Sequence, residues 1–419
     1  MTPMLTNLQT LKGFRDFLPN EARKRAYAID VIKQVFENHG FEPIETPALE
    51  YQELLLGKYG SEADKLIYKF KDNGGRDIAL RYDQTVPAAR VLAMYNQNLP
   101  MPFRRYQIQT VWRAENTQKG RYREFLQCDA DIFGSHDPLA DAECIFLAYA
   151  IYKKLGFNEL TIYLNDRNIL FDILEQVGIS QSLQLSVIQT IDKLDKKQKD
   201  EVASELSQKG LSAKTIDNLF ELLKYQAPSD YLQKVIKHSK ALGVPENSIA
   251  FFPALARGLD YYTSTIFEIK AKGYESGSLL GGGRYDKLIA NLCGIDIPAV
   301  GFAIGFDRTI DAMTQLNLFN QSAGNLGTLV AVFSENLLEK SIEIVNLLRN
   351  QNISAEIYPD VSTKLDKQLK YADKKGLTWF IVVGPSEAEK DTAIIKNLKT
   401  GHQEEVKAKE ICKKINQFS

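Results

Sequence analysis

Hydrophobic residues recur at helical spacing near the start of the chain and predict its first helix over residues 20–38. The positions that define this spacing are Ala26, Ile29, Ile32, Val35 and Phe36. His39-Gly40 follows directly, and a glycine after the last periodic residue is a typical helix end. An extended segment with two prolines, 41–47, comes next. The same reasoning predicts helices at 85–96 and 138–155.

Alternating hydrophobic and polar positions predict strands along the first two thirds of the chain. A β-hairpin is expected where 66–70 and 77–82 flank the turn-forming sequence Asp72-Asn-Gly-Gly75. Further strands are expected at 104–113, 124–133, 161–164, 262–269 and 298–305. Strands that pair as hairpins, with helices between them, are typical of an antiparallel sheet, so the expected fold class is α+β.

Two changes of pattern divide the chain. From 168 to 242 glycine and aromatic residues become rarer and charged helical stretches dominate, which indicates a helical insertion. From 326 to 419 strands alternate with helices, which indicates a small α/β domain with parallel pairings. Its strands are expected at 329–333, 353–358, 379–383 and 393–398, and its helices at 335–350, 363–375 and 407–417. The remaining parts, 1–167 and 243–322, are expected to form one catalytic domain.

Charge and composition exclude some classes of protein. Lys and Arg number 52 against 53 Asp and Glu, which argues against a basic surface throughout but leaves local basic patches open. No apolar run approaches the ~20 residues of a membrane helix, and the start lacks a signal-peptide pattern. Four scattered cysteines without zinc spacing fit a reducing compartment. A cytoplasmic location with no membrane contact is therefore expected. The 4 histidines form no cluster, so any mechanism must run without a histidine base.

Directional polar side chains gather on two neighbouring strands, within 103–133. On the first strand they are Arg105, Gln107, Gln109 and Arg113, and on the second they are Gln127, Asp129 and Asp131 beside Phe125. A hairpin aims Arg113, Gln127 and Asp131 at common space, with Arg121 and Arg123 at its turn end. Arginine binds phosphate bidentately, and a carboxylate with an amide suits an α-ammonium group. A salt-bridged sheet surface is the alternative, but so many directional groups on one face favour a ligand site.

Three shorter segments each allow two interpretations. Arg257 to Glu268 predicts a strand whose one face is either a wall for a flat polar ligand or an ordinary aromatic surface. The residues of that face are Asp260, Tyr262, Ser264, Ile266 and Glu268. Gly281-Gly-Gly-Arg-Tyr-Asp286 predicts a tight glycine turn before a helix and lacks the spacing of a phosphate-binding loop. Gly301 to Arg308 predicts a strand that feeds a helix, with Arg308 either at an anion site near the helix start or on the surface.

Taken in order, these segments resemble the motifs of class II aminoacyl-tRNA synthetases. The helix and strand within 20–47 resemble motif 1, a dimer element; 103–133 resembles motif 2, and 301–308 resembles motif 3. Arg257-Gly-Leu-Asp-Tyr-Tyr-Thr263 and Gly282-Gly-Arg-Tyr-Asp286 resemble the two histidine-specific motifs of histidyl-tRNA synthetases. The segments 12–19 and 80–85 also fit that family, and the resemblance runs from about residue 8 to 415. It includes a C-terminal domain similar to the family's anticodon-binding domain.

The resemblance implies a role for each candidate residue. Arg113 and Arg257 would be catalytic, with Arg113 on the α-phosphate of ATP and Arg257 across it, where charge develops in the transition state. Arg308 would hold the γ-phosphate, and Glu115 and Arg121 would also contact ATP. The residues implied in histidine binding are Asp83, Thr85, Gln127, Asp131, Tyr262 and Tyr285. Mg²⁺ would enter with ATP and bridge phosphate oxygens, and no protein side chain is assigned as a metal ligand.

The implied function is that of a histidine–tRNA ligase. L-histidine would react with ATP to give histidyl-adenylate and pyrophosphate, and the histidyl group would then pass to the 3′ end of tRNA(His). The implied partners are tRNA(His), L-histidine and a second copy of the chain in a homodimer. Four positions depart from the family pattern. Asp83 and Asp131 stand where many bacterial members carry Glu, and these shorter acids resemble the eukaryotic-type branch. Asp307 replaces a common Glu, and Gln84 is unusual in its motif.

Three other functions compete with this interpretation. A regulatory paralogue of histidine biosynthesis would sense histidine without charging tRNA, but such paralogues typically lack the anticodon-type domain and lose motif arginines. This chain keeps 326–419, Arg113, Arg257 and Arg308. A class II synthetase for proline, threonine or glycine would not need the pattern at 257–263. A noncatalytic tRNA-binding or scaffold protein would show no ATP-driven turnover.

Overall fold

Two compact units, 1–318 and 319–419, make up the chain and are described separately. The structure, a computed structural model, describes residues 8–56, 67–117, 120–195, 197–257, 261–319 and 327–417. Within these ranges no helix is both long and apolar enough to cross a membrane.

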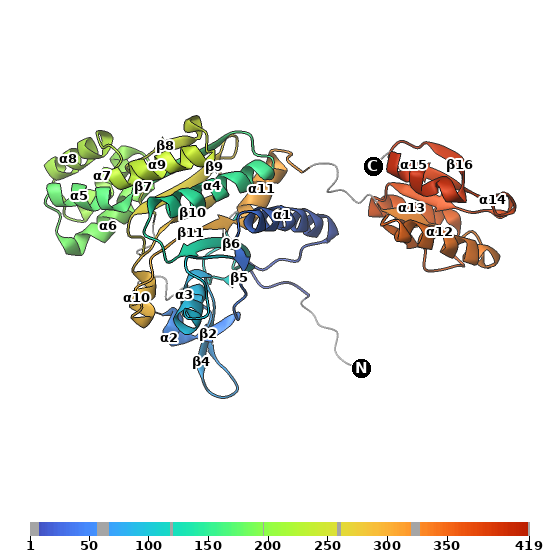
Figure 1. The fold of residues 1–419 in the computed structure, drawn as a ribbon, viewed down its shortest axis with the longest axis horizontal. Coiled ribbons are helices and arrows are strands. Elements are labelled where there is room, and N and C mark those ends of the chain that lie inside the picture. Colours follow the sequence, from blue (N-terminus) through green and yellow to red (C-terminus); the bar gives the residue numbers. More distant parts are fainter. Residues whose placement is uncertain are drawn as a thin grey trace. The chain divides into compact units, whose positions relative to one another are not determined.

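An eight-stranded sheet forms the centre of the first unit (Figure 1). In order across the sheet, its strands are β1 (Glu42–Pro43), β5 (Phe103–Trp112), β6 (Glu124–Phe133), β11 (Ala299–Gly305), β10 (Leu280–Arg284), β9 (Thr265–Ala271), β7 (Leu160–Asp166) and β8 (Ile249–Phe251). Every pair from β5 to β7 is antiparallel, and only the outer pairs β1–β5 and β7–β8 are parallel. The expected α+β fold with an antiparallel sheet is confirmed.

Helices cover this sheet. α1 (Pro19–Asn38) contacts α4 (Pro138–Lys154) and α11 (Phe306–Gln315), and α4 and α11 contact β11. The predicted helix at 20–38 is confirmed, although its buried face is centred on Ile32 and Phe36 and leaves Ala26 exposed. α3 (Thr85–Tyr95) and α10 (Leu288–Cys293) pack against each other as a second group of helices. A small sheet contains, in spatial order, β2 (Leu49–Tyr51), β4 (Asp77–Leu80) and β3 (Lys69–Lys71). α2 (Gln52–Leu55) directly follows β2 in the sequence. The predicted hairpin is β3–β4, and residue 66 of that prediction lies outside the described residues.

In its described part, the segment predicted as a helical insertion forms the short 3₁₀ helix Asp192–Asp195, loops and five α-helices. They are α5 (Arg167–Gln176), α6 (Gln181–Ile191), α7 (Lys199–Gln208), α8 (Ala213–Lys224) and α9 (Asp230–Leu242), grouped at the β7–β8 end of the sheet (Figure 1). A separate hydrophobic core holds α5 to α8 together, with residues such as Ile173, Val187, Leu206 and Leu219. Ala256, from the chain that follows β8, is also buried in this core.

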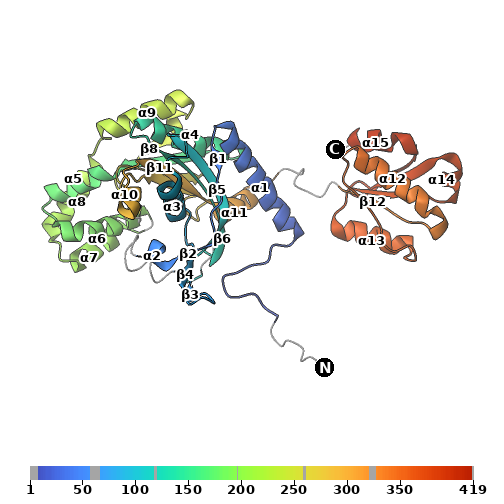
Figure 2. The same cartoon turned by 60° about the horizontal axis from the view of Figure 1, so that its bottom comes forward.

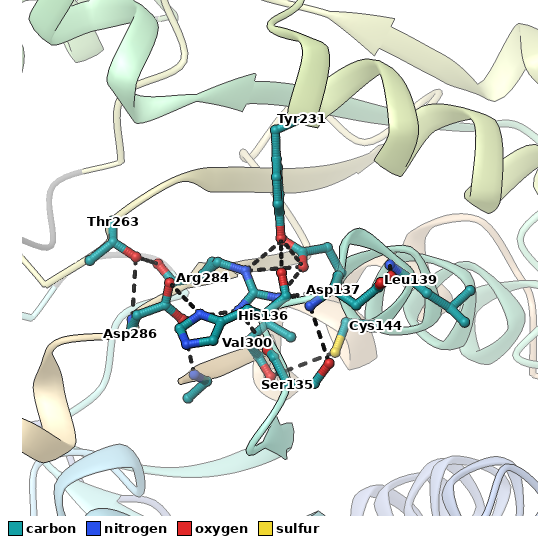
Figure 3. A network of polar contacts seen from close by, with 12 residues as sticks. Ser135, His136, Asp137, Leu139, Cys144, Tyr231, Thr263, Arg284, Asp286 and Val300 are labelled. Atoms are coloured by element: carbon teal, nitrogen blue, oxygen red, sulfur yellow. Dashed lines mark hydrogen bonds and ion pairs between the residues drawn. The ribbon is translucent and has the colours of Figure 1, made fainter. Parts of the chain in front are cut away.

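A buried arginine ties α9 to the sheet (Figure 3). Arg284, at the end of β10, is 2% exposed and donates from Nε to Asp141 of α4 at 3.1 Å. The hydroxyl of Tyr231 in α9 donates to the same carboxylate at 3.0 Å. Arg284 Nη1 also donates to the Ser135 carbonyl at 2.8 Å and to Asp286 at 3.0 Å. Removing one partner from such a buried pair costs about 3–5 kcal/mol, so this network fixes α4, α9 and β10 relative to one another.

The predicted glycine turn at Gly281 is wrong, because this segment is the central strand β10. A Cβ on Gly282 would lie 2.5 Å from the carbonyl oxygen of Gly301, and one on Gly283 would lie 2.5 Å from that of Thr265. The glycines therefore permit close strand packing rather than a turn. The strand expected at 262–269 begins only at Thr265, so Tyr262 precedes it, and Asp260 lies outside the described residues.

The second unit is a mixed sheet with helices on both faces (Figure 2). Its strands run in the order β13 (Ala355–Ile357), β12 (Thr328–Val330), β14 (Trp379–Val382), β15 (Thr392–Asn397) and β16 (Gln403–Lys407). The first three are parallel, as expected, and the last two pair antiparallel. α12 (Leu338–Asn350) and α15 (Ile411–Gln417) cover one face and α13 (Leu365–Lys375) the other. The mostly polar β16 and the short α14 (Pro385–Lys390) were not predicted.

Candidate active site

A pocket of about 530 Å³ opens over the middle of the eight-stranded sheet. β6, β9, β10 and β11 all contribute to its lining, together with the loop after β5 and the start of α11. All but two of the candidate residues line it: Asp83, Thr85, Arg113, Glu115, Arg121, Gln127, Arg257, Tyr262 and Arg308. The two exceptions, Asp131 and Tyr285, are buried residues that do not line the pocket.

Arginines from three separate segments surround the pocket. Arg113 Nε donates to the Tyr82 carbonyl at 3.0 Å, and its guanidinium lies 5.2 Å from the Phe125 ring centroid. Arg308, in the first turn of α11, donates to the Ser278 carbonyl at 3.2 Å. Burial, followed by the charge of Arg121, lowers the pKa of Arg308. A bound anion would oppose both effects, so this cluster is suited to phosphate.

Arg257 approaches the pocket from an unusual backbone conformation. Its φ of 48° lies in the left-handed region, which residues other than glycine seldom adopt. Its Nη1 donates to Glu268 of β9 at 2.7 Å. A Cβ on Gly281 would lie 1.6 Å from Nη1, so the guanidinium occupies the space that this glycine leaves free. Glu268 and Ser278 also line the pocket. Glu268 lies on the strand face predicted as a possible ligand wall, whereas nothing in the sequence around Ser278 indicates a role there.

Tyrosines enclose the other end of the pocket. Tyr262 is 6% exposed, and its ring centroid lies 4.7 Å from that of Tyr261. Tyr285 meets Tyr261 edge-on at 5.6 Å. Burial raises the pKa of Tyr262 despite the charge of Arg257, so its phenol stays protonated and can donate a hydrogen bond. Thr85, at the start of α3, and Asp83, just before it, lie beside this end.

A layer of buried polar groups lies on β5 and β6. Arg105, which shares a predicted face with Arg113, is fully buried and forms an ion pair with Asp131. The Tyr285 hydroxyl donates to Asp131, and Gln127 donates to Asp129 at 2.8 Å. Burial raises the pKa of Asp129 to about 8, against the effect of Arg105. Two buried carboxylates thus share one arginine, and Asp129 keeps its proton at neutral pH.

The protonated Asp129 makes a pH dependence testable. Its pKa rises from 3.8 to about 8 on folding, so its contribution to stability is complete below about pH 4 and is lost as pH rises through 8. We expect the free energy of unfolding of the wild type to fall relative to that of Asp129→Asn over this window, by at most about 1.4 kcal/mol per pH unit. Urea unfolding of both proteins at several pH values measures this difference. A difference that does not vary with pH would contradict the assignment.

Two further departures from the family pattern, Gln84 and Asp307, join separate elements of the fold. Gln84 is fully buried and donates to the carbonyls of Gln109 and Gln127, at 2.8 and 3.1 Å, so it fixes the start of α3 against β5 and β6. Asp307 accepts from Arg15 at 2.8 Å and from Arg25 of α1 at 2.6 Å. These contacts hold the N-terminal segment and the predicted motif 1 helix against the predicted motif 3 helix.

The central sheet is antiparallel from β5 to β7, and its arginine-lined pocket lies between the β5–β6 hairpin and α11, the helix that follows β11. These features define the catalytic domain of a class II aminoacyl-tRNA synthetase. The sequence profile described as Histidyl-tRNA synthetase matches residues 13–309, and that of the anticodon binding domain matches 328–418. This chain belongs to the histidyl-tRNA synthetase family.

Similar proteins agree with this membership. A histidine–tRNA ligase of Gloeobacter violaceus is 40% identical, and the match covers 95% of this chain and 96% of that protein. The crystal structure of a histidyl-tRNA synthetase from Nostoc sp. is 29% identical with a TM-score of 0.86, covering 99% of this chain and 100% of that one. A Bacillus halodurans structure, titled as an ATP phosphoribosyltransferase regulatory subunit/histidyl-tRNA synthetase, has a TM-score of 0.75 at 21% identity over 88% of this chain and 97% of that one. That likeness concerns the fold alone.

Proposed function

We propose that the pocket joins L-histidine to ATP and that Arg113 and Arg257 are its catalytic residues. As a member of its family, the chain is a histidine–tRNA ligase and an ATP-using enzyme. The observation that carries the assignment of the site is the convergence of Arg113, Arg257 and Arg308 on one pocket whose other end is lined by tyrosines.

The chemistry of activation fits these side chains. A carboxylate oxygen of histidine forms a bond to the α-phosphorus of ATP, the bond to the β-phosphate oxygen breaks, and pyrophosphate leaves. This step needs no protein nucleophile, so catalysis consists of positioning and of stabilising negative charge. Arg113 holds the α-phosphate, Arg257 stabilises the charge that develops on it, and Arg308 holds the γ-phosphate with Arg121 nearby. The histidyl group then passes from the adenylate to the terminal ribose of tRNA(His).

Polar groups at the tyrosine end hold the amino acid. Asp83, Thr85 and Gln127 line the pocket where they can bind the ammonium group and backbone of histidine. Tyr262 would line the imidazole end, and Tyr285 would act from outside the pocket lining through its contact with Tyr261. Asp131 contributes through Tyr285, whose hydroxyl donates to its carboxylate.

ATP would bring Mg²⁺ into the pocket, where the ion would neutralise part of the phosphate charge. Oxygen ligands suit this ion, and Glu115 is the pocket carboxylate that we propose for it. Its contacts with Arg121 and Arg113, at 3.5 and 4.0 Å, are looser than the 2.7 Å contact between Glu268 and Arg257. Glu115 can therefore turn toward an ion without breaking a short ion pair.

We expect Tyr262→Phe to weaken histidine binding while leaving the fold intact. A site built around a buried hydroxyl leaves the ligand's polar partner unsatisfied when that hydroxyl is removed, which costs about 1–3 kcal/mol, or roughly 5- to 150-fold in KM. Histidine titration in an ATP–pyrophosphate exchange assay gives KM directly. Tyr225→Phe is the matched control, because Tyr225 is 72% exposed and lies in the helical insertion. An unchanged KM in Tyr262→Phe would exclude contact between this hydroxyl and the ligand.

The proposal also covers the domain boundaries, the homodimer and the cellular location. Residues 1–167 and 243–322 form the catalytic domain, 168–242 the insertion and 326–419 the anticodon-binding domain for tRNA(His). A homodimer forms through the element at 20–47, and Leu49 and Tyr51, which follow it in the sequence, are exposed hydrophobic side chains. A cytoplasmic location suits the 4 free thiols. Sedimentation of the purified protein tests the homodimer.

Histidine-dependent ATP–pyrophosphate exchange tests the proposed activity of the pocket. Exchange with histidine and not with the other amino acids is the expected result, and charging of tRNA(His) is then measured with the same protein. A well-folded protein that shows no exchange would instead favour a regulatory, noncatalytic role.

A further inference from the structure

One side chain of the helical insertion lines the pocket and contacts the segment that carries Arg257. Asp192 follows α6 directly, at its C-terminal end. Its Oδ1 accepts from the backbone N–H of Arg257 at 2.9 Å and from that of Ala256 at 3.3 Å. The contact joins residues 65 positions apart in the sequence.

The position of Asp192 in the helices does not decide its role, because the residue ends α6 and begins a 3₁₀ helix, Asp192–Asp195. The dipole at the end of α6 disfavours an acidic residue, whereas the dipole at the start of the next helix favours one. Asp192 also faces Glu268 across the pocket; burial, and to a smaller extent the charge of Glu268, raise its pKa. A carboxylate in so unfavourable a place is held there by the two N–H groups that donate to it.

Those two N–H groups belong to the backbone that aims Arg257. The left-handed conformation of Arg257 is strained by about 1–3 kcal/mol and persists only where the surroundings hold it. Ala256 is buried in the core of the insertion, while the Arg257 guanidinium lies over Gly281 and pairs with Glu268 of the sheet. The backbone of this arginine is thus anchored on the insertion, and its side chain is anchored on the catalytic sheet.

We propose that Asp192 is a positioning residue for Arg257, so that the helical insertion sets the placement of the catalytic arginine. The proposal rests on the role proposed above for Arg257. Asp192 acts through the backbone of Arg257 rather than on the reacting atoms, and what it supplies is an acceptor oxygen in a fixed place. An amide at the same position offers the same oxygen, which separates this role from one that needs the negative charge.

The test compares variants of the full chain in histidine-dependent ATP–pyrophosphate exchange. Asp192→Ala removes the acceptor, and we expect kcat to fall on the order of 10²-fold, as for a misplacement of about 1 Å, with KM for histidine nearly unchanged. Asp192→Asn keeps the acceptor and should stay within about threefold of wild type on the same reasoning. Asp192→Glu keeps the charge but moves the carboxylate, so its kcat should fall below that of Asp192→Asn. Glu205→Ala is the control, since Glu205 is in the insertion and pairs with Lys193 and Lys197 at the surface.

Each outcome separates this inference from the proposed function. Wild-type protein without exchange would overturn the function, and an active Arg257→Ala would overturn the role of that arginine. An inactive Arg257→Ala beside a fully active Asp192→Ala would overturn the inference alone. So would an Asp192→Asn less active than Asp192→Glu, because that order requires charge rather than an acceptor. If Asp192→Ala does not fold, the order of the Asn and Glu variants still decides.

Discussion

Arg257→Ala is expected to lose adenylate formation and keep its fold. Removing one group that stabilises charge only in the transition state costs about 10²–10³-fold in kcat, and a full guanidinium charge is at the upper end of this range. The fold survives because the side chain lies at the pocket, against Glu268 and Gly281, rather than in a hydrophobic core. Pyrophosphate exchange measures the loss, and circular dichroism with thermal melting measures the fold.

The matched control for this variant is Arg76→Ala. Arg76 lies next to the hairpin turn, its side chain is 64% exposed, and it pairs with Asp72. We expect its exchange rate to equal that of wild type. An Arg257→Ala protein that exchanges pyrophosphate within a few fold of wild type would mean that charge develops elsewhere in the pocket.

Gly281→Ala is expected to be folded and nearly inactive. The three atoms nearest to an added Cβ, at 1.6, 2.1 and 2.4 Å, all belong to the guanidinium of Arg257, the far end of a flexible side chain. The methyl group therefore displaces Arg257 rather than the sheet, and we expect kcat for exchange to fall on the order of 10²-fold, the effect of misplacing a catalytic group by about 1 Å. Thermal melting should stay near that of wild type.

Gly282→Ala provides the contrast one residue further along β10. Its Cβ would meet the Gly301 carbonyl oxygen at 2.5 Å and the Phe267 ring at 2.6 Å, neither of which can move without shifting the sheet. We expect this variant to lose about 1–3 kcal/mol or more of stability. If Gly281→Ala were as active as wild type, the guanidinium could not lie over Gly281 during catalysis.

Local patterns in the sequence predict most of the fold. The hairpin of β5 and β6 and the helices α1, α3 and α4 have the expected bounds within a residue or two, because alternation and helical periodicity depend only on neighbours. β10 was predicted as a turn because glycine is common in turns. The glycines of β10 instead permit the close approach of β9 and β11, and this packing depends on residues that are distant in sequence.

The residues of the site also divide into those predictable from neighbouring residues and those that depend on distant contacts. Gln127 and Arg308 could be predicted because they sit on regular elements, and Arg113 because it directly follows β5. All three belong to recognisable motifs, and the structure brings them to one pocket. Asp131 and Tyr285 were expected at the ligand but contact each other outside the pocket lining, since the buried Arg105 attracts the carboxylate. Asp192 could not be predicted, because nothing near it in the sequence indicates that it contacts Arg257.

The order of the strands has a consequence for how the enzyme is made. β6 and β7 are synthesised early, yet in the finished sheet β11, β10 and β9 lie between them. Until residue 305 has left the ribosome, the nascent chain therefore carries two unpaired strand edges, each a template for pairing with another chain. The strands that close this gap also bring Arg257, Glu268 and Arg308 to the site. An unfinished chain thus lacks both a closed sheet and a working site.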